Sequence, residues 1–156
     1  ENNNMTTEPV LKIGIIDYGI IGTMTREEQN IFFTFFKILV SRDHKELSTF
    51  ITESLSEKID KSMADISEGD KNILVNRIST ICSTVLESDS KFFGGEEIYE
   101  INKILKTQNL QFSKFFCRVE LAIAISENVC NSLATNSSYI EQMMIAFKDI
   151  FGDDIL

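Results

Sequence analysis

Apolar residues recur at helical spacing from about Arg26 to Ser41, where Ile, Phe and Leu cover a broad face and a narrow polar stripe lies opposite. Thr25 followed by Glu28 is a capping-box sequence, in which a hydroxyl and a carboxylate bond the first free amides of a helix. The pattern therefore predicts a helix over 26–41. So wide an apolar face predicts burial of this helix against several neighbours.

The same spacing of apolar positions continues through most of the chain. Asp43 with Glu46 repeats the capping signal and opens a second helix, and Gly94-Gly95 separates two later ones. The polar stretch Ser56–Asp70 is predicted to be loop or weak helix. The further helices are expected over about 44–55, 71–86, 96–106, 113–134 and 139–151.

One segment, Val10–Ile16, has the β-branched character of a strand, and Pro9 suits its first position. A lone strand cannot satisfy its own backbone hydrogen bonds, so its partner is either missing from this chain or supplied by another one. The predicted fold class is mainly α: one short N-terminal strand, the remnant of a hairpin, followed by about six helices. Residues 1–9 are expected to form a disordered end or hairpin loop, 10–151 the helical segment and 152–156 a tail.

The length, charge and composition of the chain limit the kinds of function that we expect. The chain has 156 residues, which fits one domain or a piece of one, and a net charge of −9. Its basic residues do not cluster, so nucleic-acid binding is not expected. The sequence contains no signal-peptide pattern and no apolar run of about 18 residues. We therefore expect an intracellular protein, and the sequence does not indicate its compartment.

The three cysteines, Cys82, Cys117 and Cys130, lie far apart within helical patterns. An odd count without CxxC spacing argues against a disulfide framework or a zinc site. We expect all three to be buried, reduced thiols.

An acid interrupts the most apolar run near the amino terminus, IGIIDYGIIG. Asp17 stands where the predicted strand ends, and a buried carboxylate there is costly unless it meets a partner. Gly19 permits a sharp turn beside a bound group, and an ionised carboxylate could bind Mg²⁺ together with phosphate oxygens. The plainer interpretation is a turn in which Asp17 caps nearby amides.

The wider stretch KIGIIDYGIIGTMTREEQNIFFTFFKILVSRDHKEL resembles the UbiB/ADCK-type atypical kinases. In that family an apolar strand leads to Asp-Phe-Gly, a small apolar pair, a Gly, and a helix that carries an Arg and ends near Arg-Asp. The matching positions here are Ile15-Ile16, Asp17-Tyr18-Gly19, Ile20-Ile21, Gly22, Arg26 and Arg42-Asp43.

A looser similarity follows near the end, where AIAISENVCNSL resembles the late helix of the family. Glu127 and Leu133 fit its pattern. Asn128 replaces the usual Gly, and Ala134-Thr135 replaces the usual Asp-Pro. The resemblance extends over about residues 10–150 and is strongest in the first quarter.

The resemblance implies a kinase-like C-lobe in which Asp17 binds Mg²⁺ bridged to ATP phosphates. Gly19 would supply the turn and Tyr18 would pack as the family's Phe does. No catalytic residue is expected in this chain, because it contains no nucleotide loop, no strand Lys paired with a helix Glu, and no catalytic loop. We therefore expect a C-terminal part that needs the N-terminal part of the same protein as its partner.

The family also implies ATPase or phosphotransferase activity and a link to membrane lipids, often to ubiquinone biosynthesis. Two alternatives stay open. One is a non-catalytic helical module that binds a protein through the Phe-rich face of its first helix, with Asp17 as a turn residue. The other is a kinase-like phosphotransferase of another type, acting on small molecules.

Overall fold

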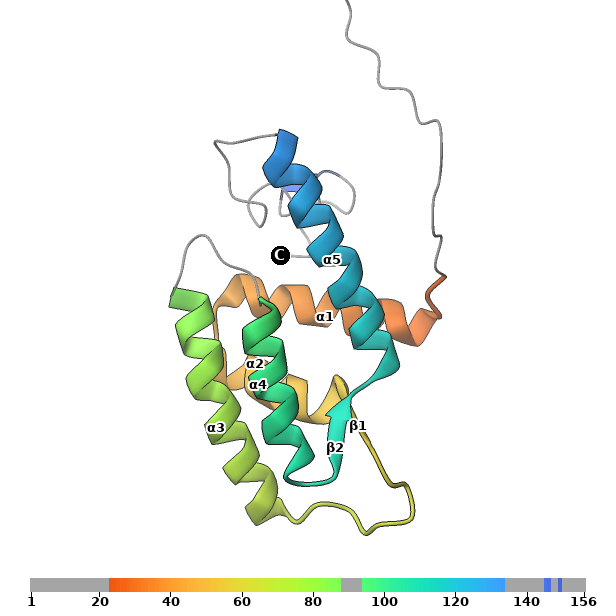
Figure 1. Ribbon diagram of the computed structural model, residues 1–156, viewed down its shortest axis with the longest axis vertical. Coiled ribbons are helices and arrows are strands. Elements are labelled where there is room, and N and C mark those ends of the chain that lie inside the picture. Colours follow the sequence, from red (N-terminus) through yellow and green to blue (C-terminus); the bar gives the residue numbers. More distant parts are fainter. Residues whose placement is uncertain (1–22, 88–93, 134–144, 147–148, 150–156) are drawn as a thin grey trace, which may run out of the picture.

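The fold is mainly helical, with a small two-stranded sheet (Figure 1). The structure is a computed structural model, and it describes residues 23–87, 94–133, 145–146 and 149. The elements within these residues are α1 (Arg26–Ser41), α2 (His44–Ser54), β1 (Ser56–Lys58), α3 (Glu68–Glu87), α4 (Gly95–Lys106), β2 (Leu110–Phe112) and α5 (Lys114–Leu133).

The five helices α1–α5 confirm the helical prediction between 26 and 133, and most of their ends agree with the sequence signals. The largest difference is the start of α3, which begins at Glu68 instead of about Lys71. Ser67 explains it, because its hydroxyl accepts from the N–H of Asp70 and donates to the Asp70 carboxylate. Gly69 within this turn weakens the helical signal of the sequence.

The prediction that Ser56–Asp70 is loop or weak helix is wrong for its first three residues. Ser56–Lys58 forms the strand β1. β1 pairs antiparallel with β2, and Glu57 lies opposite Gln111. The sequence Ser-Glu-Lys of β1 has no β-branched or aromatic residue, so nothing local marks it as a strand. Its pairing with β2 comes from the tertiary fold.

Hydrogen bonds connect the end of β2 to α4 and to the residue that follows α2. Ser113 donates its N–H to the carbonyl of Leu55, just beyond the end of α2 (N···O 2.8 Å). Phe112 donates its N–H to Oδ1 of Asn102 on α4 (3.2 Å). In this way β2 joins α4 and α2, which are far apart in sequence.

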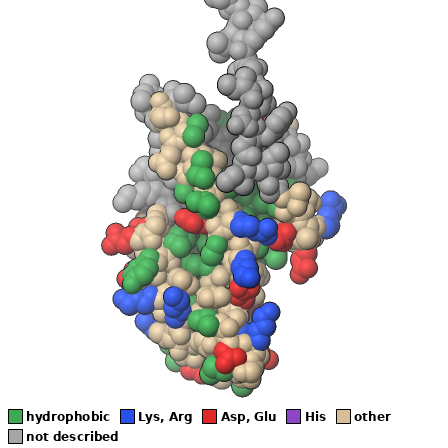
Figure 2. All heavy atoms as spheres, turned by 45° about the vertical axis from the view of Figure 1, so that its right-hand side comes forward, with side chains coloured by type: hydrophobic (Ala, Val, Ile, Leu, Met, Phe, Trp, Pro, Cys, Tyr) green, Lys and Arg blue, Asp and Glu red, His purple; other side chains and the backbone are tan. Residues whose placement is uncertain are grey.

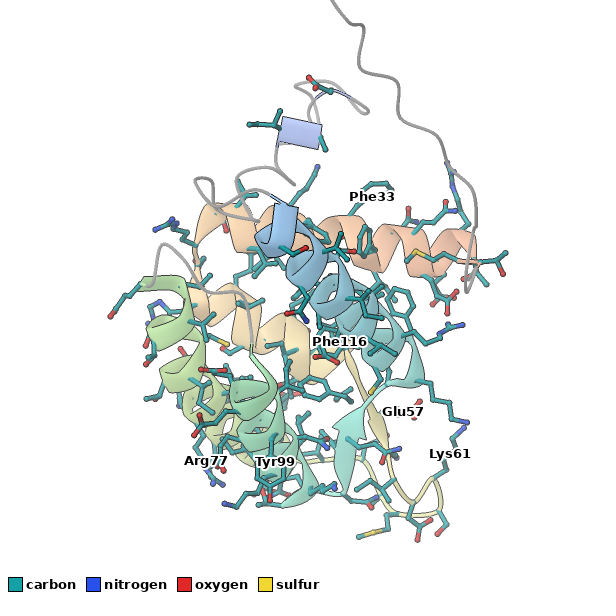
Figure 3. The ribbon with its side chains drawn as sticks, turned by 45° about the horizontal axis from the view of Figure 1, so that its top comes forward. Phe33, Glu57, Lys61, Arg77, Tyr99 and Phe116 are labelled. Carbon is teal, nitrogen blue, oxygen red and sulfur yellow. The ribbon has the colours of Figure 1, made fainter. Side chains whose placement is uncertain are left out.

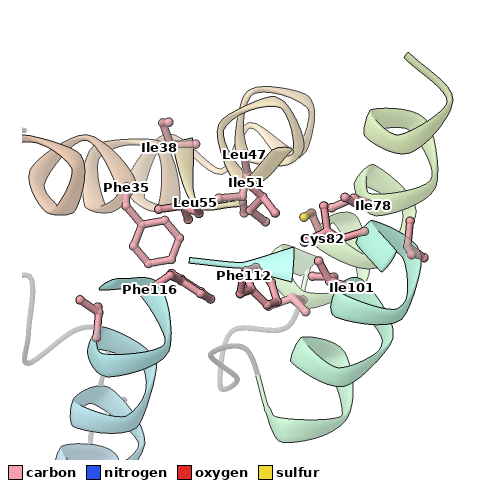
Figure 4. Packing of buried hydrophobic residues seen from close by; sticks show 14 of the residues in the cluster. Phe35, Ile38, Leu47, Ile51, Leu55, Ile78, Cys82, Ile101, Phe112 and Phe116 are labelled. Carbon is pink, nitrogen blue, oxygen red and sulfur yellow. The ribbon is translucent and has the colours of Figure 1, made fainter. Parts of the chain in front are cut away.

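The hydrophobic core lies between α1, α2, α3, α4 and the start of α5 (Figure 4). Removing such side chains from water is the main stabilising contribution to a fold of this kind. The side chains that are fully or almost fully buried include Phe35, Leu47, Ile51, Leu55, Leu74, Ile78, Cys82, Ile101 and Leu105. They come from the faces that the apolar spacing predicted.

Helix α5 rises past α1 and extends beyond the other helices (Figure 1). Phe116 lies at the base of α5 (Figure 3). It packs against Phe35 of α1 and Phe112 of β2, with ring centroids 5.7 and 4.6 Å apart (Figure 4). Val119 and Ile123 are also buried, and they continue this contact along α5.

Two predicted elements lie outside the described residues. They are the N-terminal strand at 10–16 and, apart from 145–146 and 149, the helix at 139–151. The mainly helical class is thus confirmed for residues 23–87 and 94–133.

Candidate functional site

The candidate site centres on the segment that carries Asp17, and the first described element after it is α1. Asp17, Tyr18, Gly19 and Gly22 lie outside the described residues. Thr25 is described, and it is the N-cap of α1 in an extended conformation (φ −66°, ψ 165°). The start of α1 is therefore the described part of the chain that lies nearest to Asp17 in the sequence.

The start of α1 is held by a complete capping box, as predicted. The N–H of Glu28 donates to Oγ1 of Thr25 (3.2 Å), and the N–H of Thr25 donates to Oε2 of Glu28 (2.8 Å). The hydrogen bond from the Thr25 backbone, with help from the Arg118 charge, lowers the pKa of the Glu28 carboxyl. This carboxylate is therefore ionised at neutral pH.

Arg118 on α5 completes this arrangement from a position 90 residues further along the chain. Its Nη2 donates to Oε1 of Glu28 at 2.6 Å. One carboxylate thus closes the cap of α1 with one oxygen and binds α5 with the other. The sequence gives no signal for this contact, because the spacing of both residues fits an ordinary solvated helix edge.

Magnesium and ATP are implied by the resemblance alone. The carboxylate assigned to the metal, Asp17, is outside the described residues. Within residues 23–87, 94–133, 145–146 and 149, no group of three or more His, Cys, Asp or Glu side chains is placed to hold a metal ion.

Arg42 and Asp43, which match a family position, have local structural roles. Arg42 ends α1 in the left-handed conformation (φ 55°), and its N–H donates to the carbonyl of Leu39. Asp43 is the N-cap of α2, and its Oδ1 accepts from the N–H groups of Lys45 and Glu46, both at 2.9 Å. The Glu46 amide contributes most to lowering the pKa of this carboxyl. His44 follows in the first turn of α2 and is half-buried.

The cysteines differ from one another. Cys82 is buried in the core, as expected, and burial raises the pKa of its thiol to about 12. Cys117 is exposed on α5, so the prediction that all three thiols are buried is wrong for this residue. Partial desolvation, and then the charges of Glu120 and Glu57, raise the pKa of Cys117. The side chain of Cys130 is outside the described part.

Helix α5 is less completely covered than its apolar sequence predicted. Leu121, Ile125 and Val129, four residues apart and hence on one face, are 59%, 57% and 51% exposed. Figure 2 shows hydrophobic side chains in a row on the surface where α5 lies. On the same helix Glu120 is half-buried, and the side chain of Glu127 is outside the described part.

The Phe-rich face of α1 is largely covered. Phe35 and Phe36 are buried, and Phe32 and Phe33 are half-buried. Phe32 packs edge-on against Phe36 with ring centroids 4.6 Å apart. This face serves chiefly as core, which is the default interpretation of its sequence pattern.

Compared with known proteins, the chain matches no family model, no curated protein and no solved structure. No helix within the described residues combines the length and the apolar character needed to cross a membrane.

Proposed function

We propose that this chain is the C-terminal helical part of an atypical kinase-like protein of the UbiB/ADCK type. In the intact protein Asp17 binds Mg²⁺ that carries ATP, and Gly19 and Tyr18 shape the turn beside it. The activity is ATP hydrolysis or phosphoryl transfer, with the family's link to lipid or ubiquinone metabolism and an association with membranes or lipids.

The observation that supports the proposal is the helix that follows the Asp-Tyr-Gly sequence. The resemblance expects a helix that carries an Arg and ends near Arg-Asp. Helix α1 starts at Arg26, ends at Ser41 and is followed by Arg42 and Asp43. The mainly helical fold from 26 to 133 is also what a kinase-like C-lobe requires.

The chemistry assigned to this chain is limited to binding. In phosphoryl transfer the metal neutralises charge on the phosphates, and the protein holds the metal with carboxylates. Asp17 would provide such a carboxylate. The nucleotide cradle and the catalytic loop belong to the N-terminal part, so this chain alone is not expected to be active.

The experiment is Mg-ATP binding and ATP hydrolysis by the full-length protein, with and without Asp17→Asn. The substitution removes the negative charge and keeps the shape, so magnesium-dependent ATP binding should fall at least tenfold. Asp43→Asn is the matched control, because Asn is an equally good N-cap, and it should bind as the unchanged protein does.

Equal affinity and equal hydrolysis in Asp17→Asn and the unchanged protein would overturn the proposal. Asp17 would then be a turn residue, as in a non-catalytic helical interaction module. Magnesium-dependent binding that is lost in Asp17→Asn, with an upstream nucleotide loop unlike that of the UbiB type, would instead point to another kinase-like phosphotransferase.

A further inference from the structure

We draw no further inference here: the strongest candidate, the exposed apolar row of Leu121, Ile125 and Val129 on α5, carries none, because nothing in the described part of the structure shows what covers it.

Discussion

Asn109 and Asp60 lie 49 positions apart in the sequence and bond to each other in both directions. Nδ2 of Asn109 donates to the carbonyl of Asp60 (2.9 Å), and the N–H of Asp60 donates to Oδ1 of Asn109 (3.1 Å). Asn109 also accepts the N–H of Ile59 through its own carbonyl. Its backbone is left-handed (φ 57°), a conformation that Asn tolerates better than most residues. One residue thus extends the pairing of β1 with β2 beyond the strands.

Replacing Asn109 should separate its two contributions. Asn109→Gly keeps the left-handed backbone and loses both side-chain hydrogen bonds, so it should lower the free energy of unfolding by about 1 kcal/mol. Asn109→Ala also places a β-carbon in the left-handed conformation and should lose about 1 kcal/mol more. Urea denaturation of the two variants gives the comparison. If Asn109→Gly and Asn109→Ala have the same free energy of unfolding, the left-handed backbone at residue 109 does not strain an alanine.

Helix α3 offers a matched pair of isoleucines for the core. Ile78 is fully buried, and Ile78→Ala should lower the free energy of unfolding by about 2–5 kcal/mol because it leaves a cavity. Ile73 on the same helix is 56% exposed, and Ile73→Ala should change it by no more than about 0.5 kcal/mol. Chemical denaturation with unchanged m-values tests both. A similar loss in the two variants would mean that α3 does not pack as described.

The cap of α2 should produce a pH-dependent stability. Asp43→Ala removes the acceptor for two amides and should lower Tm by about 2–4 °C at pH 7. The hydrogen bond from Glu46 lowers the pKa of Asp43 in the folded protein below its ordinary 3.8. The stabilisation is therefore complete above pH 3.8 and is lost as the pH falls through the folded pKa.

Thermal unfolding between pH 7 and pH 2.5 measures this effect. The difference in Tm between the unchanged protein and Asp43→Ala should shrink over the acidic part of the range. Asp43→Asn caps without a charge, so its difference from Asp43→Ala should stay constant. If the difference in Tm between the unchanged protein and Asp43→Ala is the same at every pH, the cap does not depend on an ionised Asp43.

The cysteines should react in a fixed order. Cys82 is buried with a pKa of about 12, so only about 0.01% of it is thiolate at pH 8, whereas Cys117 is exposed. In a Cys130→Ser background, a thiol reagent should modify one residue, Cys117, in the native protein. Cys82 should react only after denaturation. Mass spectrometry of the labelled protein identifies the site, and early labelling of Cys82 would contradict its place in the core.

The sequence predicted the helices well because their signals are local. Thr25 with Glu28 and Asp43 with Glu46 lie within one helical turn, and both caps form as expected. The apolar faces likewise depend on spacing within each helix. The start of α3 at Glu68 was missed because Gly69 obscures the capping by Ser67 and Asp70.

The contacts between distant segments could not be predicted in this way. β1 has a polar sequence and becomes a strand only because β2 lies beside it. The ion pair of Arg118 with Glu28 and the exposure of Cys117 depend on how α5 is oriented on α1. For the candidate site, the sequence alone nominates Asp17, which lies outside the described residues.

By itself the sequence determined where the helices between 26 and 133 form and which of their faces are apolar, because hydrogen bonding and capping within a helix involve neighbouring residues. Only the tertiary structure decided which apolar faces are covered, which polar segments pair, and that α5 is bonded to the first turn of α1. Those outcomes depend on the packing of residues far apart in the chain, and no local pattern encodes them.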